Sequence, residues 1–172
     1  MAHEGPTCVY VASYDDRASA DLDLVAVKQL HTNGEISGFD AAVMQRDDKG
    51  HVHIHKDETG THVGAWGGLV AGAVVGLLFP PAIIATAAIG AGLGAIGGHI
   101  WSGLSREDVK QLGAVVDDGA WGLIVMADGR LEDVAPKAFS HAKKYEQREV
   151  TGMDHNVVGE HVSSIVDLSG AD

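Results

Sequence analysis

Apolar and polar positions divide the chain into four parts. Residues 1–62 and 105–150 alternate short apolar runs with polar turns, whereas residues 63–104 contain no Asp, Glu, Lys or Arg. Residues 151–172 carry one apolar stripe at helical spacing. We therefore predict an α+β domain in two halves, an apolar element inserted between them, and a C-terminal extension that forms an amphipathic helix over 153–168.

The first half predicts a strand, a helix and two further strands. Residues 7–14 (TCVYVASY) predict a strand, and Asp15-Asp16 can cap the helix that follows. That helix is predicted to end at Asn33-Gly34. Strands are expected over 39–46 and 51–56, with the turn between them at 47–50.

The second half repeats this order. Ser105 to Asp108 resembles a capping box that opens a helix ending near Gly119. A strand is expected over 120–127, then a helix with Pro136 in its first turn, then a strand over 145–150. The doubled strand-helix-strand unit predicts a ferredoxin-like (doubled βαβ) sandwich with both helices on one sheet face.

The predicted strands are apolar on both faces, so the face without helices needs a cover. Two covers are open: the sheet of a second copy, or the C-terminal extension. The first would make the protein a homo-oligomer.

The apolar element contains two series of glycines spaced four residues apart, which is close to one helical turn. Each series leaves a stripe without side chains, and such stripes are typical of glycine zippers, in which another backbone packs closely. Pro80-Pro81 separates a helix over 63–79 from one over 82–101. The predicted packing residues are Gly64, Gly68, Gly72, Gly76, Gly90, Gly94 and Gly98.

The second of these helices would be about 30 Å long, which is the thickness of a bilayer's hydrocarbon core. A Pro-Pro turn places Trp66 and Trp101 at one level, where interfacial indoles are favoured. We expect the helical hairpin to be embedded in the inner membrane, with the α+β domain in the cytoplasm. A soluble, closed cytoplasmic shell or scaffold, with hairpins buried at its symmetry axes, is one alternative, and an ordinary intramolecular core is another.

Charge and cysteine content narrow the classes of partner. The formal net charge of −12 argues against nucleic acid and against docking on anionic lipid headgroups. The N-terminal residues lack the pattern of a secretory signal, and the single Cys8 fits a reducing compartment. No cofactor is indicated, and any small-molecule ligand is left unknown.

Candidate chemistry is sparse. Residues 92–97 fit G-x-G-x-x-G, but they lie inside an apolar helix with no strand before them, so nucleotide binding is not expected. His51, His53 and His55 alternate along a strand and could bind a metal, respond to pH, or form an ordinary solvated face. Nothing in the sequence combines an acid, a base and a nucleophile, so an enzyme is not expected.

The chain also resembles a bacterial family of small membrane proteins described as a domain of unknown function. The similarity lies in VYVASYDDRASAD, AAVMQRDDKGHVHIHKD, WGGLVAGAVVGLLFPP, GAGLGAIGG and SREDVKQLGAVVDDGAWGLIVM, across about residues 7 to 150. The resemblance implies a glycine-zipper hairpin between two strand-helix-strand halves and no established activity. The sequence thus predicts a non-enzymatic, homo-oligomeric assembly protein, embedded in the membrane by its hairpin.

Overall fold

A computed structural model describes residues 6–59, 74–79, 103–128 and 131–150. Within these ranges the chain forms a mixed α+β fold around one antiparallel five-stranded sheet, ordered β3-β2-β4-β1-β5. The strands are β1 (Thr7–Tyr14), β2 (Gly38–Arg46), β3 (Val52–Thr59), β4 (Trp121–Asp128) and β5 (Lys144–Val150).

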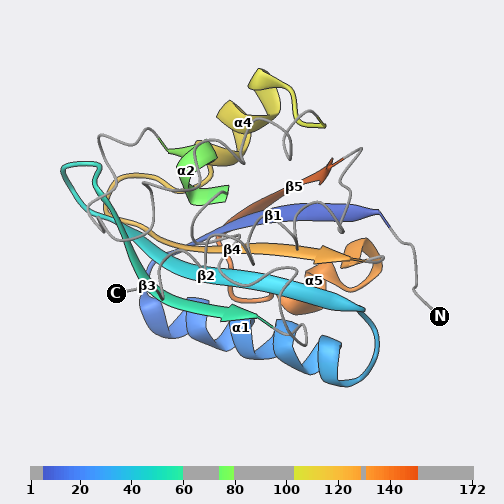
Figure 1. Cartoon of the computed structure of the whole chain (residues 1–172). Helices are drawn as coiled ribbons and strands as arrows, with labels where there is room; N and C mark the ends of the chain where they lie inside the picture. Colours follow the sequence, from blue (N-terminus) through green and yellow to red (C-terminus); the bar gives the residue numbers. More distant parts are fainter. Residues whose placement is uncertain (1–5, 60–73, 80–102, 129–130, 151–172) are drawn as a thin grey trace, which may run out of the picture.

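Helices lie on both faces of the sheet (Figure 1). The long helix α1 (Arg17–Thr32) and the single turn α5 (Ala135–Ala138), preceded by the 3-10 turn η3 (Leu131–Asp133), cover one face. The short helices α2 (Val75–Leu78) and α4 (Arg106–Gly113) lie on the other. Each face thus has its own apolar core.

Local sequence signals explain where the two longer helices begin and end. The Asp16 side chain accepts a hydrogen bond from the Ser19 amide at 2.9 Å and caps α1, and Gly34 follows the helix with a φ of +76°. Ser105 and Asp108 form the expected capping box at the start of α4. These predictions are confirmed.

The second face of the sheet is covered from within the chain. Val9, Val11 and Met126 of the sheet are fully buried in one cluster with side chains from α2 and from the end of α4. The expected pairing with the sheet of a second copy is therefore wrong for this face. The apolar pattern showed that a cover was needed, but a pattern does not say which segment supplies it.

Three elements differ from the prediction in length. The helix expected to end near Gly119 stops at Gly113, because the Val115 amide bonds to the Leu112 carbonyl oxygen in a turn instead of continuing the helix. The helix expected around Val134 to Ala142 is only η3 and α5, although Pro136 does lie in its first turn. β3 runs on to Thr59 because its residues continue to pair with β2, as far as Asp40. That pairing shifts between Val43 and Met44, where Val43 lies opposite Lys56 and Met44 opposite Ile54, so His55 is the extra residue of a β-bulge.

Candidate functional site

The apolar element touches the domain through α2. Val74, Val75, Leu78 and Phe79 are buried against the sheet, in the cluster that also contains residues of α4. Gly76, on the opposite side of this single turn, is exposed, and a Cβ built on it would have no atom within 4 Å. The glycine side of α2 therefore faces away from the domain.

Gly76 is the one member of the glycine series that the structure describes. The other six predicted packing glycines (Gly64, Gly68, Gly72, Gly90, Gly94 and Gly98) and the predicted interfacial residues Trp66 and Trp101 lie outside the described residues. Among the helices that are described, none is long and apolar enough to cross a membrane.

A close backbone contact joins α2 to α4, at a glycine that the sequence did not single out. A Cβ on Gly113 would lie 2.9 Å from the carbonyl oxygen of Leu78. Real Cβ atoms essentially never approach a backbone oxygen this closely, so glycine lets the two helices meet here. Gly113 falls outside the four-residue series, and its role in the fold follows only from the packing of α4 on α2.

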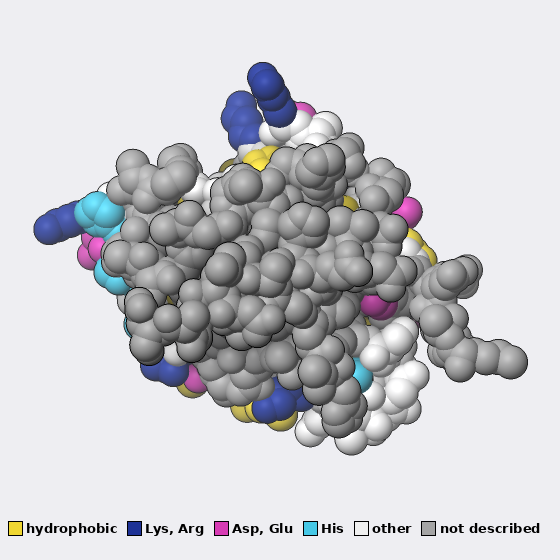
Figure 2. Space-filling view, viewed as in Figure 1, with side chains coloured by type: hydrophobic (Ala, Val, Ile, Leu, Met, Phe, Trp, Pro, Cys, Tyr) yellow, Lys and Arg dark blue, Asp and Glu magenta, His cyan; other side chains and the backbone are white. Residues whose placement is uncertain are grey.

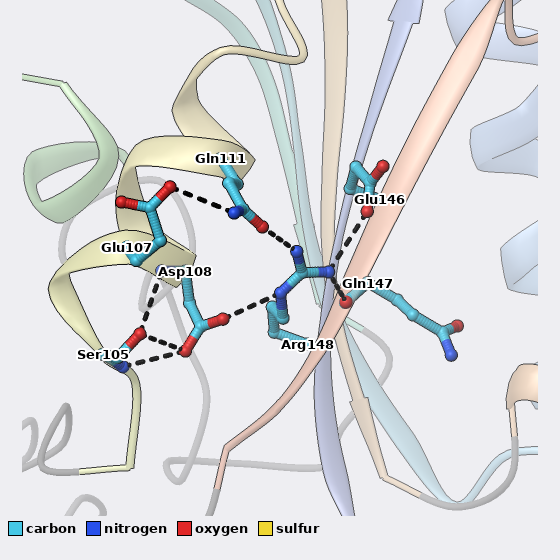
Figure 3. Close-up of polar contacts among 7 residues, drawn as sticks. All are labelled: Ser105, Glu107, Asp108, Gln111, Glu146, Gln147 and Arg148. Carbon is cyan, nitrogen blue, oxygen red and sulfur yellow. Dashed lines mark hydrogen bonds and ion pairs between the residues drawn. The ribbon is translucent and has the colours of Figure 1, made fainter.

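Arg148 of β5 holds α4 in place from the other side (Figure 3). Its Nε donates to Asp108 at 2.9 Å, and its other nitrogens donate to Gln111, Glu146 and the Gln147 carbonyl oxygen. The side chain is 26% exposed, so this network is partly shielded from water. α4 is therefore fixed both to the sheet edge and to α2.

The three histidines that the sequence singled out, His51, His53 and His55, lie in two different environments. His53 Nε2 lies 3.0 Å from Asp47 Oδ2 and His51 Nδ1 lies 3.5 Å from the same oxygen. Figure 2 shows histidines beside charged side chains at this edge of the molecule. His55 instead contacts the Trp121 ring, with 4.7 Å between ring centroids, because the bulge displaces it from the alternation.

No metal site forms from this row within the described ranges, where no three His, Cys, Asp or Glu side chains are arranged to hold an ion. His51 and His53 instead flank a carboxylate that also accepts the amides of Lys49 and His51. The His53 contact is the largest cause that lowers the pKa of Asp47 from 3.8 to about 2. This cluster thus organises the turn between β2 and β3.

The pKa of Asp47 has a consequence for acid stability. Because the folded-state pKa is lowered, the charged carboxylate stabilises the turn above pH 3.8, and this contribution is lost as the pH falls through about 2. We expect Asp47→Asn to flatten the fall in melting temperature between pH 4 and pH 2, followed by circular dichroism. Asp48→Asn, at the exposed neighbouring position, should retain the wild-type slope; equal slopes in all three proteins would contradict the assignment.

His55 lies in a small stack at the N-terminal end of α1. The Arg17 guanidinium carbon lies 5.9 Å from the Trp121 ring centroid, on which His55 also packs. Burial, followed by the positive charge of Arg17, lowers the pKa of His55. The neighbouring positive charge of Arg17 disfavours the binding of a cation at His55.

A buried carboxylate, Asp23, ties three elements together and was missed by the sequence analysis. Asp23 is fully buried in α1; it accepts a hydrogen bond from the Tyr14 hydroxyl at 3.0 Å and lies 2.6 Å from His141 Nδ1. The His141 amide also donates to it, at 3.1 Å to Oδ2. Burial is the first cause, and Asp23 the second, that raises the pKa of Tyr14 far above its ordinary value.

This cluster of Tyr14, Asp23 and His141, called the clasp below, links the end of β1, α1 and the segment after α5. The His141 side chain is half exposed, so one edge of the ring meets solvent. The sequence signal was available: Asp23 falls on the apolar stripe of α1 beside Ala20 and Val27, where a carboxylate needs buried partners.

A cavity of about 420 Å³ opens near the start of β5. Its charges are already paired: Lys143 with Asp15 at 2.7 Å, Lys144 with Asp117 at 3.0 Å, and Asp118 with Arg46 at 2.8 Å. The lining therefore favours neither an anion nor a cation. It is formed by Ser13, Asp15, Asp117, Asp118, Gly119, Ala120, Lys143 and Lys144.

The fold and these contacts define a small α+β protein in which residues 74–79 of an apolar segment lie on the second face of an antiparallel sheet. The chain belongs to the family described as Protein of unknown function (DUF1269), whose match covers residues 65–159, more than half of the chain. The match starts and ends later than the 7–150 region of the resemblance and reaches into the C-terminal extension. No curated protein and no solved structure matches the chain.

Proposed function

We propose that this chain is a non-enzymatic protein that assembles with copies of itself through its apolar element, residues 63–104. The observation that carries the proposal is Gly76: it is exposed, its missing side chain leaves open space, and the opposite side of its helix is buried in the domain. A glycine in a helix costs about 1 kcal/mol relative to alanine. A backbone packing against this side would offset that cost.

We further propose that the α+β domain is a ferredoxin-like sandwich with β3 added at one edge. The strand order β2-β4-β1-β5 and the position of α1 and α5 on one face support this. In this arrangement the apolar element is inserted between the two halves, and the domain serves as its base.

Membrane embedding of the element is part of the proposal and rests on its composition: residues 63–104 carry no Asp, Glu, Lys or Arg. It requires residues 74–79, which lie just before the Pro80-Pro81 turn, to leave the sheet as the hairpin enters the bilayer. Their packing on the sheet favours a second candidate function, a soluble closed assembly or scaffold in which the element is buried between copies. In both cases the protein's main partner is itself.

The test is Gly76→Leu. A leucine side chain at this position points into open space and meets no atom of the domain, so the fold should be retained. It does fill the space that another backbone would occupy. Blocking a close contact costs about 1–3 kcal/mol, so we expect association to weaken roughly 10- to 100-fold and the mass from light scattering to fall toward the 17.9 kDa monomer.

The matched control is Lys137→Leu, which adds the same side chain at an exposed position of α5, another single helical turn. It should leave the mass unchanged. An unchanged mass for Gly76→Leu would refute assembly through this side of α2. Fractionation of cells without detergent separates the two candidates: membrane embedding predicts the chain in the membrane pellet, and the soluble assembly predicts a high-mass particle in the supernatant.

A further inference from the structure

Helix α1 is apolar on two opposite sides. One side packs on the sheet through residues that include Leu24 and Val27. The other side carries Leu22 and Val25, which are 54% and 46% exposed, with Ala18 one turn before them. A surface helix with one packed side is usually polar on the other, so a second apolar stripe indicates a surface that another segment covers.

We propose that residues 157–168, the C-terminal part of the helix expected over 153–168, cover this stripe as an amphipathic helix lying antiparallel to α1, with residues 151–156 as an extended linker. These residues lie outside the described part of the chain, and the proposal rests on three observations about where they start, how long they are and what charge they carry. It does not depend on the proposed assembly through residues 63–104.

The extension starts at the end of the sheet where α1 ends. Val150, the last residue of β5, pairs with Thr7, and Thr7 pairs with Asp128 of β4. The same row continues to Gly38 of β2, a few residues after α1, and the last turn of α1 reaches it through His31. Figure 1 shows the tip of β5 and the last turn of α1 at the same end of the molecule.

The lengths are compatible with this path. Residues 151–156 can span about 20 Å when extended. The path from β5 to the far side of α1 crosses about two strand spacings, roughly 10 Å, and the diameter of one helix, about 10 Å, so this linker is just long enough. Residues 157–168 as a helix would be about 18 Å long, and α1 is about 24 Å long. The apolar stripe of the extension (Val157, Val158, Val162, Ile165 and Val166) can therefore lie over Val25 and then Leu22.

Charge favours the same pairing. Residues 151–172 contain acidic side chains and no Lys or Arg. Arg17 and Lys28 lie beside the exposed stripe of α1, and the acid among them, the partly exposed Asp21, is paired with Arg17 at 3.4 Å. In a chain with a net charge of −12, this helix surface is one that an acidic segment can approach without repulsion.

The test measures how fast a maleimide reacts with Val25→Cys in the full chain; the native Cys8 is buried and gives a slow background. We expect the added substitutions Val162→Asp and Ile165→Asp to speed the reaction about tenfold or more, because a charged tail helix would leave the stripe uncovered. Ser163→Asp with Ser164→Asp, on the polar side of the same segment, is the matched control and should leave the rate unchanged.

Two outcomes would overturn the proposal. In the first, Val25→Cys in the otherwise unchanged chain already reacts as fast as Lys49→Cys, placed on the exposed turn between β2 and β3. In the second, the cysteine is protected, but the protection survives the aspartate substitutions and disappears on dilution. A second copy would then be the occupant of the stripe.

Discussion

Replacing Asp23 with alanine is expected to lower the free energy of unfolding by about 3 kcal/mol. The carboxylate is fully buried and is the shared partner of the Tyr14 hydroxyl, the His141 amide and the His141 ring. Removing it leaves buried donors without their partner and loosens the attachment of the segment after α5. Urea unfolding followed by circular dichroism measures the change, with the same slope expected for both proteins.

Asp21→Ala is the matched control for Asp23→Ala. Asp21 lies on the same helix but is partly exposed, and its ion pair with Arg17 at 3.4 Å is a surface pair. Such a pair contributes about 0–1 kcal/mol. If Asp21→Ala costs as much as Asp23→Ala, the clasp is not what holds these elements together. Tyr14→Phe should cost less in the Asp23→Ala background than in the wild type, because the hydroxyl has then already lost its partner.

Gly113→Val is expected to destabilise the domain by about 2 kcal/mol. The new Cβ would lie 2.9 Å from the Leu78 carbonyl oxygen, which is backbone and cannot rotate away, so α4 or α2 must move. The movement would uncover part of the core on the second sheet face. Thermal unfolding measures the loss, and binding of a hydrophobic dye reports the uncovered surface.

The same substitution at Gly76 provides the comparison. Gly76→Val meets open space, so it should change domain stability by less than about 1 kcal/mol. Equal losses at the two glycines would mean that the contact between α2 and α4 does not stabilise the fold. Loss of assembly with Gly76→Val, without loss of stability, would further support the proposed self-association.

The sequence predicted the elements whose signals are local. Asp16, Gly34 and Ser105 act on their own neighbours, so the ends of α1 and the start of α4 could be predicted without knowledge of the fold. The segment that covers the second sheet face could not be predicted, because the apolar residues of segment 63–104 could pack equally well against lipid, another copy or their own domain. The structure places Val74 to Phe79 on the sheet.

In the candidate site too, local spacing predicted some features, and others depend on contacts between distant residues. Alternation predicted that His53 and His55 share a strand face, but one extra residue in the pairing of β3 with β2 separates them. Asp23 gains its role from His141, 118 positions away, and no spacing rule joins residues so distant. Gly76 was singled out by its period alone; its exposure is described, but its partner is still a prediction.

The two edges of the sheet differ in kind, and both have a consequence for a protein proposed to gather many copies. β3 is interrupted by its bulge, and β5 presents a row of charged side chains that includes Lys144, Glu146 and Glu149. Interrupted or charged edges resist the addition of further strands. Copies held at high local concentration would therefore not join their sheets edge to edge. The assembly would then be a particle with a defined number of subunits instead of a fibril.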